Sequence, residues 1–292
     1  MNHRGFQELV VRNDRVVFTS DADLKAALRK LSDFRTVSDY ALLNLDLGPY
    51  QGPYGRVRNL VNDSTKTRIT VSYKPRYRRL SLIRVAVVPN DLPGLRRREL
   101  AHILQAFAPH QLAIVEMAID VPRIRNLNAE VVRRHLKFGK ARMRRNWRFP
   151  KAVWLGAPAS AKFLRCYPKP EVRGFRVEAQ FNRAFLKKHR IKTPHDFLRL
   201  PALLAKDVGF FDVDWPKLSR YAKRHFRHPS EFLRMARDRR RSLNGLLSFL
   251  RGVIPNANRF LVPMKINDEI SKALEQWREQ WSNDNSRRHH RN

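Results

Sequence analysis

Carboxylates lie on the polar faces of two stretches in which polar and apolar residues alternate. In 112–121, LAIVEMAIDV, Glu116 and Asp120 share one face of a predicted strand, because successive side chains point to opposite faces. In 174–182, GFRVEAQFN, Glu178 lies on the polar face. If both strands belong to one sheet, the three carboxylates converge, and such oxygen ligands suit Mg²⁺ or Mn²⁺. The spacing therefore predicts a metal site formed by Glu116, Asp120 and Glu178.

A tyrosine between two cations precedes the second stretch. In KFLRCYPK, Tyr167 lies two residues after Arg165 and two before Lys169. Phosphoryl transfer beside a metal needs a nucleophile and cations for the phosphate oxygens. We therefore predict Tyr167 as the nucleophile, with Arg165 and Lys169 as its catalytic partners.

Two alternatives stay open for these residues. Polar faces of antiparallel sheets also carry Glu, Arg and Gln in solvated or salt-bridged form, without a metal. Tyr167 is equally compatible with a sheet tyrosine whose hydroxyl faces solvent. Tyr73 and Tyr77 are further candidates for the nucleophile, or for core residues or base-stacking platforms.

The charge balance identifies the class of partner. The chain has 292 residues, with 60 Lys and Arg against 26 Asp and Glu, and a formal net charge of +34. Such self-repulsion is relieved by a polyanion, so nucleic acid is the leading partner and an acidic membrane surface the second. The single cysteine, Cys166, excludes an internal disulfide framework and a cysteine zinc cluster. Since no apolar segment is long enough for a membrane span or signal peptide, we expect a soluble, cytoplasmic protein without a membrane partner.

The periodicities predict an α+β fold. We expect a central antiparallel sheet, helices packed on one of its faces, and the other face open for DNA. The stretch 50–59 is expected to form a turn or loop. The predicted strands are 66–74, 80–88, 112–121, 162–167 and 174–182, and the predicted helices are 94–108 and 128–147.

The predicted helix 128–147 is strongly basic. The segment 123–151 contains eleven basic residues and one acid, Glu130. Basic residues spaced three or four apart would form one cationic ridge on this helix, which favours phosphate binding over a merely solvated face. The predicted nucleic-acid contacts are Arg123, Arg125, Arg133, Lys137, Lys140, Arg144 and Arg176.

The last third of the chain is predicted to be helical and basic. We expect an α+β domain over 1–190, a helical region over 191–281 and a charged, disordered tail over 282–292. Within 229–253, two short helices flank a basic turn, which is compatible with a helix-turn-helix reader or with an ordinary helical hairpin. The final amphipathic helix either packs on the domain or forms a homodimer contact.

The motifs together resemble the replication initiation factor family, the rolling-circle initiators of plasmids and filamentous phages. The resemblance covers roughly residues 66–190 and rests on the order of short motifs. An acid and an Asp on one strand are followed by a Gly with a nearby Ser, a basic-x-Tyr-x-Lys segment and an Arg-x-Glu strand. In this chain the acid and the Asp are Glu116 and Asp120, and the Gly and Ser are Gly156 and Ser160. The basic-x-Tyr-x-Lys segment is Arg165, Tyr167 and Lys169, and the Arg-x-Glu strand carries Arg176 and Glu178.

This resemblance implies a metal-dependent endonuclease that nicks one DNA strand at an origin and forms a phosphotyrosyl intermediate. The implied partners are origin DNA, single-stranded or in a hairpin, and a host helicase, in a bacterial cytoplasm at the nucleoid. The chain departs from the family pattern in three ways. Glu116 stands where an Asp is usual, Pro168 follows the tyrosine, and the region after it is short. The longer Glu side chain changes the expected ligand geometry.

Three classes of function follow from these observations. The first is the nicking initiator, and the second is a DNA- or RNA-binding protein on the same scaffold, with its carboxylates in salt bridges. The third is a structural or membrane-surface protein held by charge alone, in which strand faces carrying acids would have no use.

Overall fold

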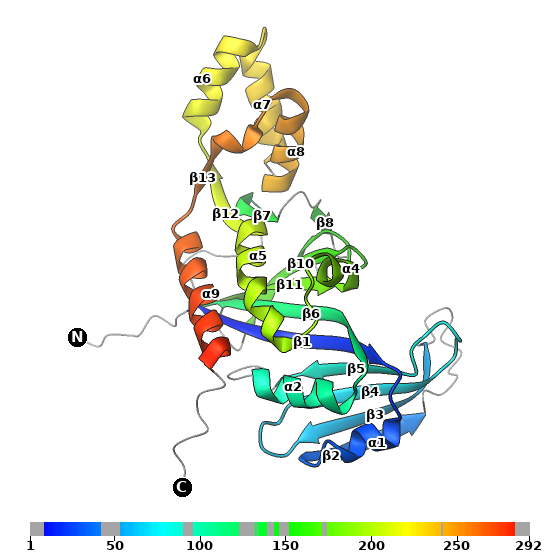
Figure 1. Ribbon diagram of the computed structural model, residues 1–292. Coiled ribbons are helices and arrows are strands. Elements are labelled where there is room, and N and C mark those ends of the chain that lie inside the picture. The colour runs from blue at the N-terminus through cyan, green and yellow to red at the C-terminus, as the bar shows by residue number, and fades with distance from the viewer. Residues whose placement is uncertain are drawn as a thin grey trace, which may run out of the picture. The chain divides into compact units, whose positions relative to one another are not determined.

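A computed structural model describes residues 9–41, 53–89, 96–122, 132, 134–138, 143–145, 152–170, 174–240 and 242–283 (Figure 1). Four of the predicted nucleic-acid contacts lie outside the described residues: Arg123, Arg125, Arg133 and Lys140. Most of the predicted tail, from residue 284 onward, also lies outside them.

A ten-stranded sheet runs in the order β2-β3-β4-β5-β1-β6-β11-β10-β9-β8. Antiparallel pairing joins β2 to β3, β3 to β4, β4 to β5, β5 to β1, β8 to β9 and β9 to β10. The strands at its centre, β1, β6 and β11, are distant in sequence, so the sheet depends on non-local pairing. Its strands are β1 (Val10–Ser20), β2 (Phe34–Ala41), β3 (Tyr54–Asn62), β4 (Arg68–Pro75), β5 (Ile83–Val88), β6 (His110–Val121), β8 (Met143–Arg145), β9 (Val153–Leu155), β10 (Lys162–Lys169) and β11 (Gly174–Asn182).

The α+β class and the predicted antiparallel sheet are confirmed. Each of the five predicted strands overlaps an observed one, namely β4, β5, β6, β10 and β11. The prediction of a turn or loop over 50–59 is wrong where β3 begins at Tyr54. Within β3, the apolar residues Val57 and Leu60 are buried, and pairing with both β2 and β4 outweighs the Gly and Pro residues that precede the strand.

The predicted helix 128–147 is confirmed at Val132, Arg134 and His135, which are helical, and wrong at the two strands that follow. Leu136–Phe138 forms the strand β7, and Met143–Arg145 forms β8. Leu136 and Phe138 are buried while Lys137 between them is half-buried, which is the two-residue period of a strand. β7 pairs antiparallel with β12 (Val208–Val213), a partner seventy residues away that the local pattern could not reveal. β12 also pairs with β13 (Leu261–Pro263), giving a second sheet of three strands.

The helix α2 (Arg97–Ala106) lies along strands β3 to β5 (Figure 1). Its buried residues include Leu100, Ile103 and Leu104, spaced at helical periodicity. Glu99 fixes its start, because Thr67 donates a hydrogen bond of 3.0 Å to the Glu99 carboxylate from the β3–β4 turn. The predicted helix 94–108 is thus confirmed in type and position. A shorter helix, α1 (Leu24–Arg29), is capped by the Asp23 side chain.

The chain groups into two compact units. One comprises Met1–Val11, Ile119–Ala179 and Arg199–Trp277, and the other Arg12–Ala118, Gln180–Leu198 and Arg278–Asn292. Neither unit is continuous in sequence. Three of the five limits fall inside strands, namely β1, β6 and β11.

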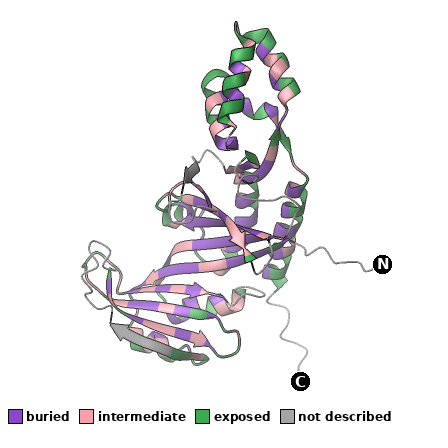
Figure 2. Ribbon diagram, turned by 180° about the vertical axis from the view of Figure 1, so that it is seen from behind, coloured by how far each residue is buried: buried purple, intermediate pink, exposed green. Residues whose placement is uncertain are grey.

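The helical C-terminal region predicted from sequence is present, and the basic turn does separate two helices. A core of its own joins α6, α7 and α8, with Leu218, Phe232 and Leu247 among its buried members. The exposed residues of these helices lie on their outer surfaces (Figure 2).

Among the described helices, none combines the length and apolar character needed to cross a membrane. The helices of this part are α4 (Arg183–Lys188), η3 (Pro194–Arg199), α5 (Leu200–Asp207), α6 (Trp215–His225), α7 (Pro229–Arg239), α8 (Leu243–Val253), η4 (Ala257–Phe260) and α9 (Ile266–Asn283).

Candidate active site

Tyr167 and Glu178 meet on the neighbouring strands β10 and β11. The Tyr167 hydroxyl donates a hydrogen bond of 2.7 Å to Glu178 Oε2. The other oxygen, Oε1, accepts a hydrogen bond of 2.8 Å from Arg165 Nε, and Arg165 Nη2 contacts the same atom. Glu178 is 1 % exposed, so this carboxylate interacts with protein groups and hardly with solvent. The predicted nucleophile, one of its predicted cationic partners and one predicted metal ligand are therefore brought together.

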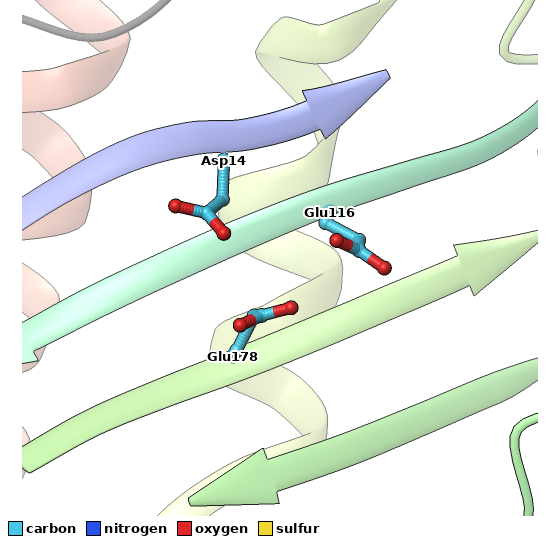
Figure 3. A group of neighbouring side chains, drawn as sticks. All are labelled: Asp14, Glu116 and Glu178. Carbon is cyan, nitrogen blue, oxygen red and sulfur yellow. The ribbon is translucent and has the colours of Figure 1, made fainter. Parts of the chain in front are cut away.

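Three carboxylates form a cluster that the sequence analysis predicted only in part. Oxygens of Asp14, Glu116 and Glu178 all lie within 4.8 Å of one another. The side chains come from β1, β6 and β11, which are hydrogen-bonded neighbours in the sheet (Figure 3). Arg15 Nη2 donates a hydrogen bond of 2.5 Å to Glu116 Oε1. We call Asp14, Glu116 and Glu178 the carboxylate cluster.

The electrostatics of the carboxylate cluster favour a bound cation. Glu116 and Glu178 are buried and Asp14 is half-buried, so the mutual repulsion of their charges is poorly screened by water. Arg15 and Arg165 each neutralise one glutamate. An all-oxygen donor set of this kind suits a hard cation. The cluster could therefore hold a metal ion.

Asp120, a predicted metal ligand, and Arg176, a predicted DNA contact, form an ion pair with each other. Arg176 Nε donates a hydrogen bond of 2.6 Å to Asp120 Oδ1, and Arg176 Nη2 donates one of 3.0 Å to Oδ2. The side chains are 4 % and 2 % exposed, respectively. This is a buried bidentate ion pair, so Asp120 is not grouped with the carboxylate cluster and Arg176 is not available at the surface for a DNA phosphate.

Replacing Asp120 with Asn should therefore destabilise the fold. Arg176 would keep its charge in a buried site without a full counter-charge, at a cost of about 3–5 kcal/mol. The measurement is the free energy of urea-induced unfolding. The matched control is Asp63→Asn, which breaks the exposed pair of Asp63 with Arg35 and should cost at most about 1 kcal/mol. Equal losses in both variants would contradict a structural role for the buried pair.

A glycine permits the close approach of β11 to β6. A Cβ atom on Gly174 would lie 2.0 Å from the Val121 carbonyl oxygen, so another residue would force the strands apart at this point. Since β6 carries Glu116 and β11 carries Glu178, Gly174 helps to set the spacing of the carboxylates.

Cys166, next to Tyr167 in sequence, is unsuited to act as a nucleophile. The residue is fully buried, and burial raises the pKa of its thiol, with a smaller contribution from the negative charge of Glu178. The thiol therefore stays protonated at neutral pH and behaves as a core residue. Tyr167, half-buried on the same strand, is the more accessible of the two.

The remaining predicted cations do not form one helical ridge. Lys137 lies in β7, its ammonium nitrogen 5.2 Å from the centre of the Phe211 ring, and burial is the main reason why its pKa is lowered. Arg144 lies in β8, in the other sheet. Lys169 is the last residue of β10 and is half-buried.

Asp14 and Arg15 are the site residues that the sequence analysis missed. The signal that could have found them is VVRNDRVVF, in which three charged residues and an Asn are enclosed by β-branched residues. Comparison of the chain with protein-family models and with curated proteins finds no match.

Proposed function

We propose that the protein is a rolling-circle replication initiator that nicks one strand of DNA at an origin through Tyr167. The observation that carries this proposal is the 2.7 Å hydrogen bond from the Tyr167 hydroxyl to Glu178, a member of the carboxylate cluster. A potential nucleophile, a proton acceptor and a potential cation site thus share one carboxylate. This combination is the one that transfer of a phosphoryl group to a tyrosine requires.

In the proposed reaction, the Tyr167 oxygen attacks a phosphodiester phosphorus. A bond forms between the phenolic oxygen and phosphorus, while the bond from phosphorus to one sugar oxygen breaks. The phenolic proton passes to Glu178, and the released sugar oxygen takes up a proton to leave as a hydroxyl. Arg165, which holds Glu178 in place, also offers positive charge for the phosphate oxygens. The phosphotyrosyl bond retains the energy needed for later rejoining.

The residues of the carboxylate cluster fit a Mg²⁺ or Mn²⁺ ion through their oxygen donors. When bound, such an ion would supply positive charge that polarises the scissile phosphate. Arg15 and Arg165 already neutralise part of the cluster, so we expect binding to be weak enough to require free metal in the assay.

The test is formation of a covalent adduct. A labelled single strand carrying a candidate origin is incubated with the protein and Mg²⁺ or Mn²⁺, and the protein is then denatured. Label on the denatured protein, absent with EDTA, is the expected result. Absence of label with every candidate origin would overturn the proposal.

A nucleic-acid-binding protein without chemistry is the second candidate. The observation in its favour is that Glu116 and Glu178 both form ion pairs with arginines, which provides a role for these acids without a metal. Metal-dependent cleavage of a supercoiled plasmid separates the candidates, since only the nicking initiator relaxes it.

DNA binding in either case needs an accessible cationic surface, and α6 provides one. Lys217, Arg220 and Arg224 are exposed and recur at helical spacing, on the side away from buried Leu218 and Ala222. We propose that they contact phosphates of duplex DNA.

Replacing Lys217, Arg220 and Arg224 together with Ala should lower the salt dependence of duplex binding. Each lost phosphate contact reduces the slope of log affinity against log salt by about 0.9, so a loss approaching three is expected. Fluorescence anisotropy at several salt concentrations measures it. The charge-matched control replaces three exposed residues, Lys25 and Arg29 of α1 and Lys30 directly after it. Equal slope changes in both variants would mean that only net charge matters.

A further inference from the structure

The end of β4 and its connection to β5, together residues 74–82, present an aromatic ring and several cations to solvent. Tyr77 is 53 % exposed, and the exposed side chains around it in sequence are Lys74, Arg78 and Arg79. The guanidinium carbon of Arg79 lies 5.9 Å from the centre of the Tyr77 ring. No Asp or Glu occurs from Ser64 to Asn90. We call residues 74–82 the β4–β5 loop.

The backbone of the β4–β5 loop is held in place. The Leu80 amide donates a hydrogen bond of 3.1 Å to the Tyr77 carbonyl, which closes a turn, and the Arg76 amide donates one of 2.9 Å to the Pro53 carbonyl. At its end, the Leu82 amide donates to Asp21 Oδ1 at 2.9 Å. An exposed tyrosine on an ordered loop can bind a flat ligand without much further loss of backbone entropy.

The exposed ring of Tyr77 stabilises the fold less than a buried ring would. Stacking on a nucleobase would bury the Tyr77 ring. Single-stranded DNA offers both unpaired bases and phosphates, which match the ring and the cations, respectively. Duplex DNA hides the faces of its bases, so it matches the cations alone. We propose that the β4–β5 loop is a single-stranded DNA binding surface, with Tyr77 stacking on a base and Lys74, Arg78 and Arg79 contacting phosphates.

The proposed surface is separate from the residues of the nicking reaction, and only the choice of DNA over RNA rests on the proposed function. Binding can therefore be measured in EDTA, where no nicking is expected. A failure of the adduct assay would leave this proposal standing, and a failure of the binding assay would leave the proposed chemistry standing.

The experiment compares full-length variants by fluorescence anisotropy with an oligothymidylate of about 12 nucleotides and with an abasic strand of the same length. Tyr77→Ala should weaken binding to the oligothymidylate by at least about fivefold, the equivalent of 1 kcal/mol of stacking, and leave binding to the abasic strand unchanged. Tyr77→Phe should behave as the wild type, because the ring is retained. The matched control is Leu82→Ala, which removes an apolar side chain of the same 53 % exposure from the same loop and should change binding less than twofold.

Four results would overturn the proposal. These are an unchanged affinity of Tyr77→Ala, an equal loss in Leu82→Ala, tighter Tyr77-dependent binding to an oligouridylate, and tighter Tyr77-dependent binding to phosphatidylserine vesicles. The last two would assign the loop to RNA or to an acidic membrane. Thermal unfolding of each variant verifies that affinities are compared between folded proteins.

Discussion

Tyr167→Phe is expected to abolish nicking and the covalent protein–DNA adduct. The substitution removes the oxygen that would attack phosphorus, and the hydrogen bond of 2.7 Å to Glu178 with it. Loss of a covalent nucleophile lowers the rate by at least about 10³-fold, so both signals should fall below detection. DNA binding should persist, because the ring and the surrounding cations remain. The adduct assay with labelled single strands, together with anisotropy at the same salt concentration, measures the two properties separately.

Tyr73→Phe and Tyr77→Phe are the controls for this variant, because either tyrosine would be the next candidate for the nucleophile. Both should form the adduct at the wild-type rate. An adduct that persists in Tyr167→Phe and disappears in one of these two variants would transfer the role to that residue. A Tyr167→Phe protein that loses DNA binding as well would point to a positioning role for the hydroxyl.

The sheet could be predicted from local patterns where one face of a strand is apolar. The stretches 112–121 and 174–182 alternate cleanly, and both form strands over nearly those residues. The same patterns placed Tyr167, Arg165 and Glu178 on strands that prove to be neighbours. Local information failed at β7, where three residues adopt a strand because β12 pairs with them.

The membership of the carboxylate cluster depends on strand order, which local sequence does not determine. Asp14 lies about a hundred residues before Glu116, and the two meet because β1 is inserted between β5 and β6. Asp120 was predicted as a ligand because it shares a strand face with Glu116. The buried guanidinium of Arg176 pairs with it, and alternation along a strand cannot tell a metal ligand from a salt-bridged acid.

Asp14→Asn should weaken metal binding. The substitution replaces one carboxylate of the carboxylate cluster with a neutral amide, which lowers the attraction of the cluster for a divalent cation. Mn²⁺ should raise the unfolding temperature of the wild type, because a ligand that binds only the folded state stabilises it, and should have little effect on Asp14→Asn. Affinity for Mn²⁺, measured by calorimetry, should fall at least about tenfold, and metal-dependent nicking should fall with it.

Asp120→Asn is the matched variant, since it replaces a buried acid of the same sheet that is paired with Arg176. It should show the opposite result, with a lower unfolding temperature and an undiminished stabilisation by Mn²⁺. If Asp14→Asn binds Mn²⁺ as the wild type does and Asp120→Asn does not, the ligand set originally predicted from sequence would be right and the carboxylate cluster would lose its role. If Mn²⁺ stabilises none of the three proteins, the role of Glu116 and Glu178 is to form ion pairs with Arg15 and Arg165. The second candidate, a protein that binds nucleic acid without cleaving it, is then favoured.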